Sequence, residues 1–137
     1  MDFNKLPNHR KADFYREAYF AWKRDAFDHM GFFPIFNNFK EEFILRELSG
    51  NALKLYVYLG LNSGNKTGET WTSIEKISQY FDKSPRAISN WIKELENLQL
   101  IERIQLKHNE SSHTFLRPYG EKTLYEKKYS SNITKSE

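Results

Sequence analysis

The chain has 137 residues, a formal net charge of +3 and a sequence pI of about 9.0. That length is enough for one domain with a modest core, and a charge this small gives only weak support for any class of partner. The chain contains no cysteine, which excludes disulfide bonds and thiolate metal sites. No apolar run approaches the roughly 20 residues that cross a bilayer, so we expect a soluble, cytoplasmic protein without a membrane segment.

The first predicted element is a helix in residues 10–30, which contains no glycine or proline and stops before Gly31. Its aromatic side chains cover more than one face of the helix, which is more apolar surface than one packing partner covers. A second copy of the chain is therefore an expected partner, giving a homodimer. The contact residues would be Phe14, Tyr19, Trp22 and Phe27. The alternative is that this N-terminal extension, residues 1–30, wraps around its own domain.

Two more helices are predicted before the middle of the chain. Residues 38–48 have a helical pattern, and a second helix starts at Ser49 and runs to about Leu61. The second helix is apolar on nearly all sides, which is typical of a central buried helix.

The stretch from Ser73 to Leu116 has the order of a helix-turn-helix followed by a β hairpin. Ser73 is a suitable N-cap for a first helix. After it, apolar residues recur at helical spacing, at Ile74, Ile77 and Phe81. Ser84 and Pro85 are typical of the start of a second helix. The apolar residues of that helix recur at spacings of three and four: Ile88, Trp91, Ile92, Leu95 and Leu98.

The opposite face of this second helix carries the residues that could bind a ligand. Its first two turns are polar and contain no acidic residue before Glu94. Arg and Lys can donate to guanine, Asn can pair with adenine, and Ser can contact a phosphate or a base edge. We expect DNA contacts from Lys83, Ser84, Arg86, Ser89, Asn90 and Lys93. The alternative is that this face is an ordinary polar helix surface without a binding role. Glu94 and Glu96 are expected to be solvated.

The hairpin is predicted from alternation in residues 101–106, a polar turn at 107–112 and a second β-rich run at 113–118. As a wing it would place Lys107, His108 and Asn109 against a neighbouring groove or phosphate; alternatively, it only completes the fold. The expected fold is mainly α with a small antiparallel β wing. It is a winged helix-turn-helix domain of residues 31–118, with the added N-terminal helix and a partly disordered C-terminal tail of residues 119–137.

Catalytic and metal-binding patterns are weak in this sequence. The segment from Gly60 to Thr67 differs from a phosphate-binding loop, because Asn65 separates Gly64 from Lys66. The histidines have no metal-ligand spacing. They are His9, His29, His108 and His113. We expect no enzymatic activity, no cofactor and no metal.

The stretch from Gly31 to about Arg117 resembles the N-terminal winged-helix domain of bacteriophage and plasmid replication initiators and replisome organisers. The matching segments are residues 33–38, 48–59, 71–78 and 84–101. The resemblance implies that the helix starting at Ser84 and Arg86 inserts into the major groove of double-stranded DNA. The protein would then regulate transcription or replication of a plasmid-type or phage-type element and lie at the bacterial nucleoid when bound to DNA. The alternative is a protein-interaction module, a replisome or partition adaptor, in which the winged helix is a scaffold and the N-terminal helix captures the partner.

Overall fold

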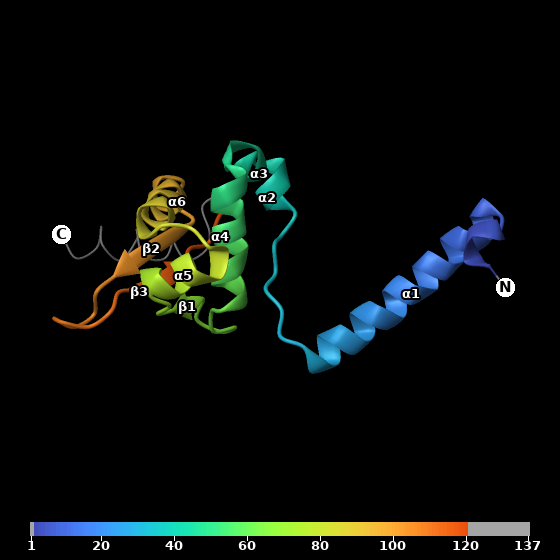
Figure 1. Cartoon of the computed structure of the whole chain (residues 1–137), viewed down its shortest axis with the longest axis horizontal. Coiled ribbons are helices and arrows are strands. Elements are labelled where there is room, and N and C mark those ends of the chain that lie inside the picture. The colour runs from blue at the N-terminus through green and yellow to red at the C-terminus, as the bar shows by residue number, and fades with distance from the viewer. Residues whose placement is uncertain (1, 121–137) are drawn as a thin grey trace, which may run out of the picture. The chain divides into compact units, whose positions relative to one another are not determined.

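The protein is described from a computed structural model that covers residues 2–120 (Figure 1). It divides into two compact units, with the boundary between Phe32 and Phe33. Most of its regular elements are helices, and one small sheet is antiparallel. The predicted fold class is therefore confirmed. The predicted tail, residues 119–137, lies outside the described residues except for Tyr119 and Gly120.

The first unit consists of a short 3-10 helix, η1 (Phe3–Lys5), and the long helix α1 (Asn8–His29). The Phe3 ring packs on α1, with its centroid 5.1 Å from that of Phe14 and 5.6 Å from that of Tyr15. At the other end, the N–H of Met30 donates to the carbonyl of Ala26 and ends the helix. No residue of α1 is buried.

The second unit contains five helices and three strands among the described residues (Figure 1). In chain order they are α2 (Asn38–Glu41), α3 (Ile44–Glu47), α4 (Gly50–Leu61), β1 (Glu69–Thr70), α5 (Ile74–Phe81), α6 (Pro85–Asn97), β2 (Ile101–Ile104) and β3 (His113–Leu116). The single helix predicted over residues 38–48 is wrong. Phe43 has a φ of 64°, and this left-handed conformation cannot continue a right-handed helix, so α2 and α3 are separate.

The sheet has the strand order β1-β3-β2, and both pairings are antiparallel. Ile101 pairs with Leu116 and Ile104 with His113, while Glu69 of β1 pairs with Phe115. The strands of the wing are shorter than predicted, since β2 ends at Ile104 and β3 at Leu116. The helix-turn-helix is therefore joined to the wing through β1, which precedes α5 and pairs with β3.

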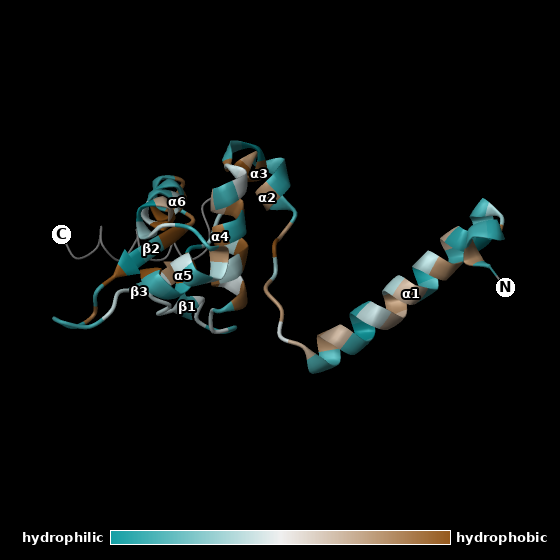
Figure 2. Cartoon of the chain, viewed as in Figure 1, coloured by the Kyte–Doolittle hydropathy of each residue, from teal (hydrophilic) through white to brown (hydrophobic). Residues whose placement is uncertain are grey.

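The core of the second unit forms around α4. Leu55, Tyr56 and Leu59 of α4 are buried, and α4 and α6 pack against each other. The buried residues from the other elements include Ile77, Ile88, Ile92, Leu95 and Ile101. Figure 2 shows apolar residues prominent in α4, whereas polar and apolar residues are mixed along α1. The predicted central helix is confirmed, and α5 and α6 rest on it.

Candidate nucleic-acid interface

The turn between α5 and α6 fixes the direction of the second helix. Asp82 has a φ of 53°, which ends α5, and the N–H of Lys83 donates to the carbonyl of Ser78. The Ser84 hydroxyl then accepts from the N–H of Ala87 at 3.2 Å, with Pro85 in the first turn of α6. This is the N-cap predicted from the sequence, and it orients the exposed face of α6.

The outer face of α6 carries three of the predicted contact residues in one line. Arg86, Asn90 and Lys93 follow one another at i, i+4 and i+7, and all three are exposed. On the opposite side, Ile88 and Ile92 are buried in the core. The line therefore points away from the domain.

The other predicted residues of the helix-turn-helix lie beside this line. Lys83 and Ser84 are exposed at the start of α6, where the Ser84 hydroxyl already caps the helix. Ser89 is half-buried, at the edge of the outer face. That these residues contact DNA stays a prediction.

Glu94 has a structural role that the sequence did not indicate. Its Oε2 accepts from both the backbone N–H and the hydroxyl of Ser49, each at 2.9 Å. Ser49 is the N-cap of α4, and its hydroxyl also accepts from the N–H of Ala52. The prediction of a solvated Glu94 is therefore wrong, because this carboxylate links α6 to the start of α4.

The wing is a hairpin whose tip is exposed. Lys107, His108 and Asn109 are all exposed, and Asn109 has a φ of 69°, as a tight turn requires. The Gln105 side chain donates to the carbonyl of Glu110 at 2.9 Å and closes the loop. All three predicted wing residues thus share the tip.

Arg103 lies at the base of the wing and is partly enclosed. Burial lowers the pKa of Arg103 from its usual value, and the nearby carboxylate of Glu96 acts in the opposite direction. Glu96 thus lies near a cation, which offsets its negative charge beside the outer face of α6.

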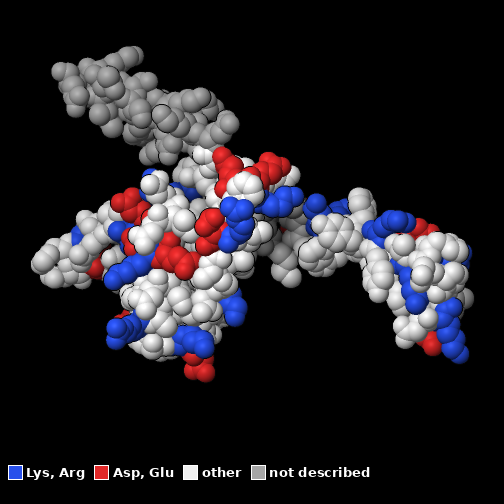
Figure 3. Space-filling view, turned by 90° about the horizontal axis from the view of Figure 1, so that it is seen from above, with Lys and Arg blue, Asp and Glu red and all other residues white. Residues whose placement is uncertain are grey.

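Basic side chains do not form one continuous patch on the described face seen in Figure 3. There, Lys and Arg residues are interspersed with Asp and Glu residues. On that face, any positive field is therefore local rather than spread over one patch.

The predicted partner residues of α1 do not share one face. The rings of Tyr19 and Trp22 lie next to each other, with centroids 5.6 Å apart. Phe14 instead packs against Phe3. Phe27 stacks on Phe32 at 4.7 Å, so the four residues divide into three groups.

Within residues 2–120, no three His, Cys, Asp or Glu side chains are placed to hold a metal ion together. None of the helices in this part of the chain has the length and apolar character needed to cross a membrane.

Residues 46–101 match a family described as a helix-turn-helix domain. The match runs from α3 to the first residue of β2 and includes both α5 and α6. With the hairpin that follows, the predicted winged helix-turn-helix is confirmed.

A solved structure described as "Structure of Rep-DNA complex" is similar to this chain. It has a TM-score of 0.49 and 16% sequence identity, and covers 80% of this chain and 93% of that chain. No curated protein matches the sequence.

Proposed function

We propose that the protein binds double-stranded DNA by inserting α6 into the major groove. The observation that carries this proposal is the exposed line of Arg86, Asn90 and Lys93 on the second helix of the helix-turn-helix. An arginine can donate to guanine O6 and N7, and an asparagine can pair with adenine through two hydrogen bonds. Lys93 and Lys83 would contact guanine or phosphate.

The wing supports the same orientation of the domain. Its tip carries Lys107, His108 and Asn109, which are suited to phosphates or to the minor groove beside the site. The acids near α6 do not prevent this, because Glu94 is bonded to Ser49 and Glu96 lies near Arg103. The total charge is small, but the charge near the outer face of α6 favours an anionic partner.

The process that we propose is regulation of replication or transcription of a plasmid-type or phage-type element. The support is the resemblance of the stretch from Gly31 to about Arg117 to the winged-helix domains of replication initiators, together with the helix-turn-helix match. The protein would act in the cytoplasm at the nucleoid, as a binding protein rather than an enzyme, with no cofactor.

We also propose that α1 pairs with α1 of a second copy. Most of the stability of a helix in a protein comes from packing, and none of the 22 residues of α1 is buried, so this helix would gain stability from a partner. Tyr15, Tyr19 and Trp22 recur at the spacing of three and four that two packed helices share, with Ala12 and Ala26 continuing the series. Of the predicted contact residues, Tyr19 and Trp22 lie on this seam, residues 12–26, whereas Phe14 and Phe27 lie outside it.

The alternative function is a protein-interaction module that uses the winged helix as a scaffold. Its support is the exposed aromatic surface of α1, where Tyr19 and Trp22 are 58% and 64% exposed. A stable protein partner that is lost on changing Trp22, with no salt-sensitive DNA binding, would favour this alternative.

The decisive test is fluorescence anisotropy with labelled duplexes across a salt series, after selection of a preferred site from random sequences. Phosphate contacts predict an affinity that falls steeply as salt rises. Arg86→Ala should cost about 1–3 kcal/mol and relax specificity at one base pair. Lys40→Ala is the control for lost charge, because α2 and α6 lie on different sides of α4 (Figure 1). Equal binding by Arg86→Ala and Lys40→Ala would contradict the assignment of α6 as the reading helix.

A further inference from the structure

Trp71 is a large aromatic side chain that the core does not use. It is 65% exposed and lies between β1 and α5. Its position is nevertheless fixed, since its ring centroid is 5.6 Å from that of His113, and His113 is bonded to the carboxylate of Glu69. An exposed indole that is held in place can act as a flat binding platform.

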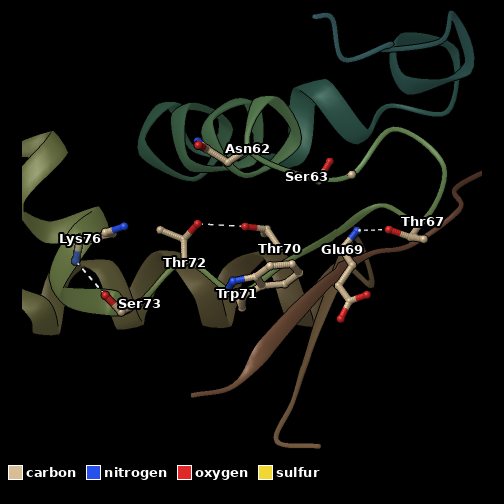
Figure 4. A pocket seen from close by; sticks show the side chains of 10 residues that line it. Asn62, Ser63, Thr67, Glu69, Thr70, Trp71, Thr72, Ser73 and Lys76 are labelled. Carbon is tan, nitrogen blue, oxygen red and sulfur yellow. Dashed lines mark hydrogen bonds between the residues drawn. The ribbon is translucent and has the colours of Figure 1, made fainter. Parts of the chain in front are cut away.

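Two hollows adjoin this indole. The larger one has a volume of about 740 Å³ and lies between the end of α4 and the start of α5 (Figure 4). It is lined by Asn62, Ser63, Gly64, Thr67, Glu69, Thr70, Trp71, Thr72, Ser73 and Lys76. The smaller one, of about 460 Å³, is shared with the wing through Asn109, Glu110 and His113.

The lining of the larger hollow combines one aromatic face with hydroxyl groups and a cation. Lys76 is the cation, and Figure 4 shows its side chain on the Thr72 side of the hollow. The hydroxyls of Thr70 and Thr72 bond to each other at 2.9 Å, a bond that uses one of their two hydrogens and leaves the other for a ligand oxygen. These groups suit a sugar ring on the indole and a phosphate beside it.

The carboxylates near Trp71 indicate which hollow takes the phosphate. Glu69 lines the larger hollow, but its carboxylate is already bonded to the His113 side chain. Glu110 lines the smaller hollow, where no Lys or Arg side chain is present among the lining residues. The larger hollow, with Lys76, is therefore the better phosphate site.

We propose that the hollow beside Trp71 binds a sugar–phosphate unit of the DNA backbone next to the site read by α6. This inference rests on the proposed DNA binding and adds contacts to it. Trp71 precedes α5 in the chain and shares its second hollow with Asn109 at the wing. The Trp71 site is thus bordered by α5, the first helix of the helix-turn-helix, and by the wing. The indole packs on the deoxyribose, Lys76 pairs with the phosphate, and the Thr72 hydroxyl donates to a phosphate oxygen.

The test compares three variants of the full chain, Trp71→Ala, Trp71→Phe and Lys76→Gln, on the preferred duplex. Trp71→Ala should weaken binding about tenfold, whereas Trp71→Phe retains an aromatic face and most of the affinity. Lys76→Gln should reduce the slope of log affinity against log salt by about 0.9 in magnitude, because one phosphate contact is lost. Tyr80→Ala removes another exposed aromatic side chain of the same unit and is the matched control, expected to bind as wild type. Circular dichroism melting verifies that each variant is folded.

A second arm separates the DNA backbone from a free nucleotide as the source of the sugar–phosphate. Tryptophan emission of wild type and Trp71→Phe is recorded with the duplex and with thymidine 5′-monophosphate. A change in emission that occurs in wild type but not in Trp71→Phe, and with the duplex but not with the nucleotide, supports the proposal. The same change with the free nucleotide, together with unaltered duplex affinity of Trp71→Ala, overturns the backbone assignment. If Arg86→Ala weakens binding and Trp71→Ala does not, the Trp71 site is wrong while the DNA-binding function stands. If wild type binds no duplex, the proposed function fails.

Discussion

Helices α1 and α6 both carry many apolar side chains, mostly aromatic in α1 and mostly aliphatic in α6, but only α6 belongs to a core. In α6, Ile88, Ile92 and Leu95 repeat along one side and are buried. In α1 the aromatic residues are spread around the helix, and none is buried. The spacing of apolar residues, rather than their number, thus decides which helix packs within its own domain. The aromatic surface left on α1 is available to another molecule.

The largest expected effect that tests this comparison of α1 with α6 is on the free energy of unfolding. Leu55→Ala removes a side chain that is fully buried in α4, and should lower the free energy of unfolding of the winged unit by about 3 kcal/mol. Trp22→Ala removes a larger side chain from α1 and should leave that unfolding transition unchanged. Urea titrations followed by circular dichroism measure both. A similar loss in the two variants would contradict the division into two units.

The second prediction concerns the seam on α1. Replacing both Tyr19 and Trp22 by alanine should weaken self-association by about 2 kcal/mol or more, as for central aromatic residues of an interface. Phe20→Ala is the control, because Phe20 is equally exposed but lies off the seam. Sedimentation equilibrium gives the dissociation constants. A wild-type chain that is monomeric at all concentrations would rule out the homodimer.

The same homodimer makes a prediction about the DNA site. Two copies of α6 related by a twofold axis require an inverted repeat, with half-sites about 34–36 Å apart. Site selection from random duplexes shows whether such a repeat is found. Selection of a single short site would instead indicate a monomer on DNA.

The second stability effect depends on pH and involves Tyr56 in the core. Burial, with a smaller contribution from Tyr119, raises the pKa of Tyr56 above its ordinary value of 10.0. Above that pH the unfolded chain releases the phenol proton while the folded chain retains it, so ionisation favours unfolding. The contribution of Tyr56 to the free energy of unfolding is complete below pH 10.0 and is lost as the pH rises beyond that value. Tyr56→Phe should remove this part of the alkaline loss. An identical alkaline profile in wild type and variant would show that Tyr56 does not titrate differently on folding.

Local sequence signals predicted the helix-turn-helix well. The serine caps and the apolar spacing of α5 and α6 involve residues within a few positions of one another, and both helices were found where expected. The line of Arg86, Asn90 and Lys93 follows from the same spacing, although its contacts with DNA remain a prediction.

The features that were missed depend on backbone strain or on distant contacts. Nothing in the residue types around Phe43 indicates a left-handed conformation, so the break between α2 and α3 was not predicted. The bond from Ser49 to Glu94 joins positions 45 residues apart. Trp71 meets His113 only because β1 pairs with β3, which no local pattern in the sequence specifies.

The smallest expected effect comes from replacing one acidic residue in α6 and, for comparison, one in α1. Glu94→Gln keeps an oxygen that can accept from Ser49 but removes the negative charge at the start of α4. The charge–dipole attraction there predicts a loss of about 0.5 kcal/mol in the unfolding of the winged unit. Glu17→Gln on α1 should cause no loss, because Glu17 is exposed on a helix with no buried residue. DNA affinity should rise by less than about twofold in Glu94→Gln, because its carboxylate already faces α4 rather than the outer face of α6. A large gain in DNA affinity without any loss of stability would show that Glu94 faces the duplex, and the bond to Ser49 would then not be its main role.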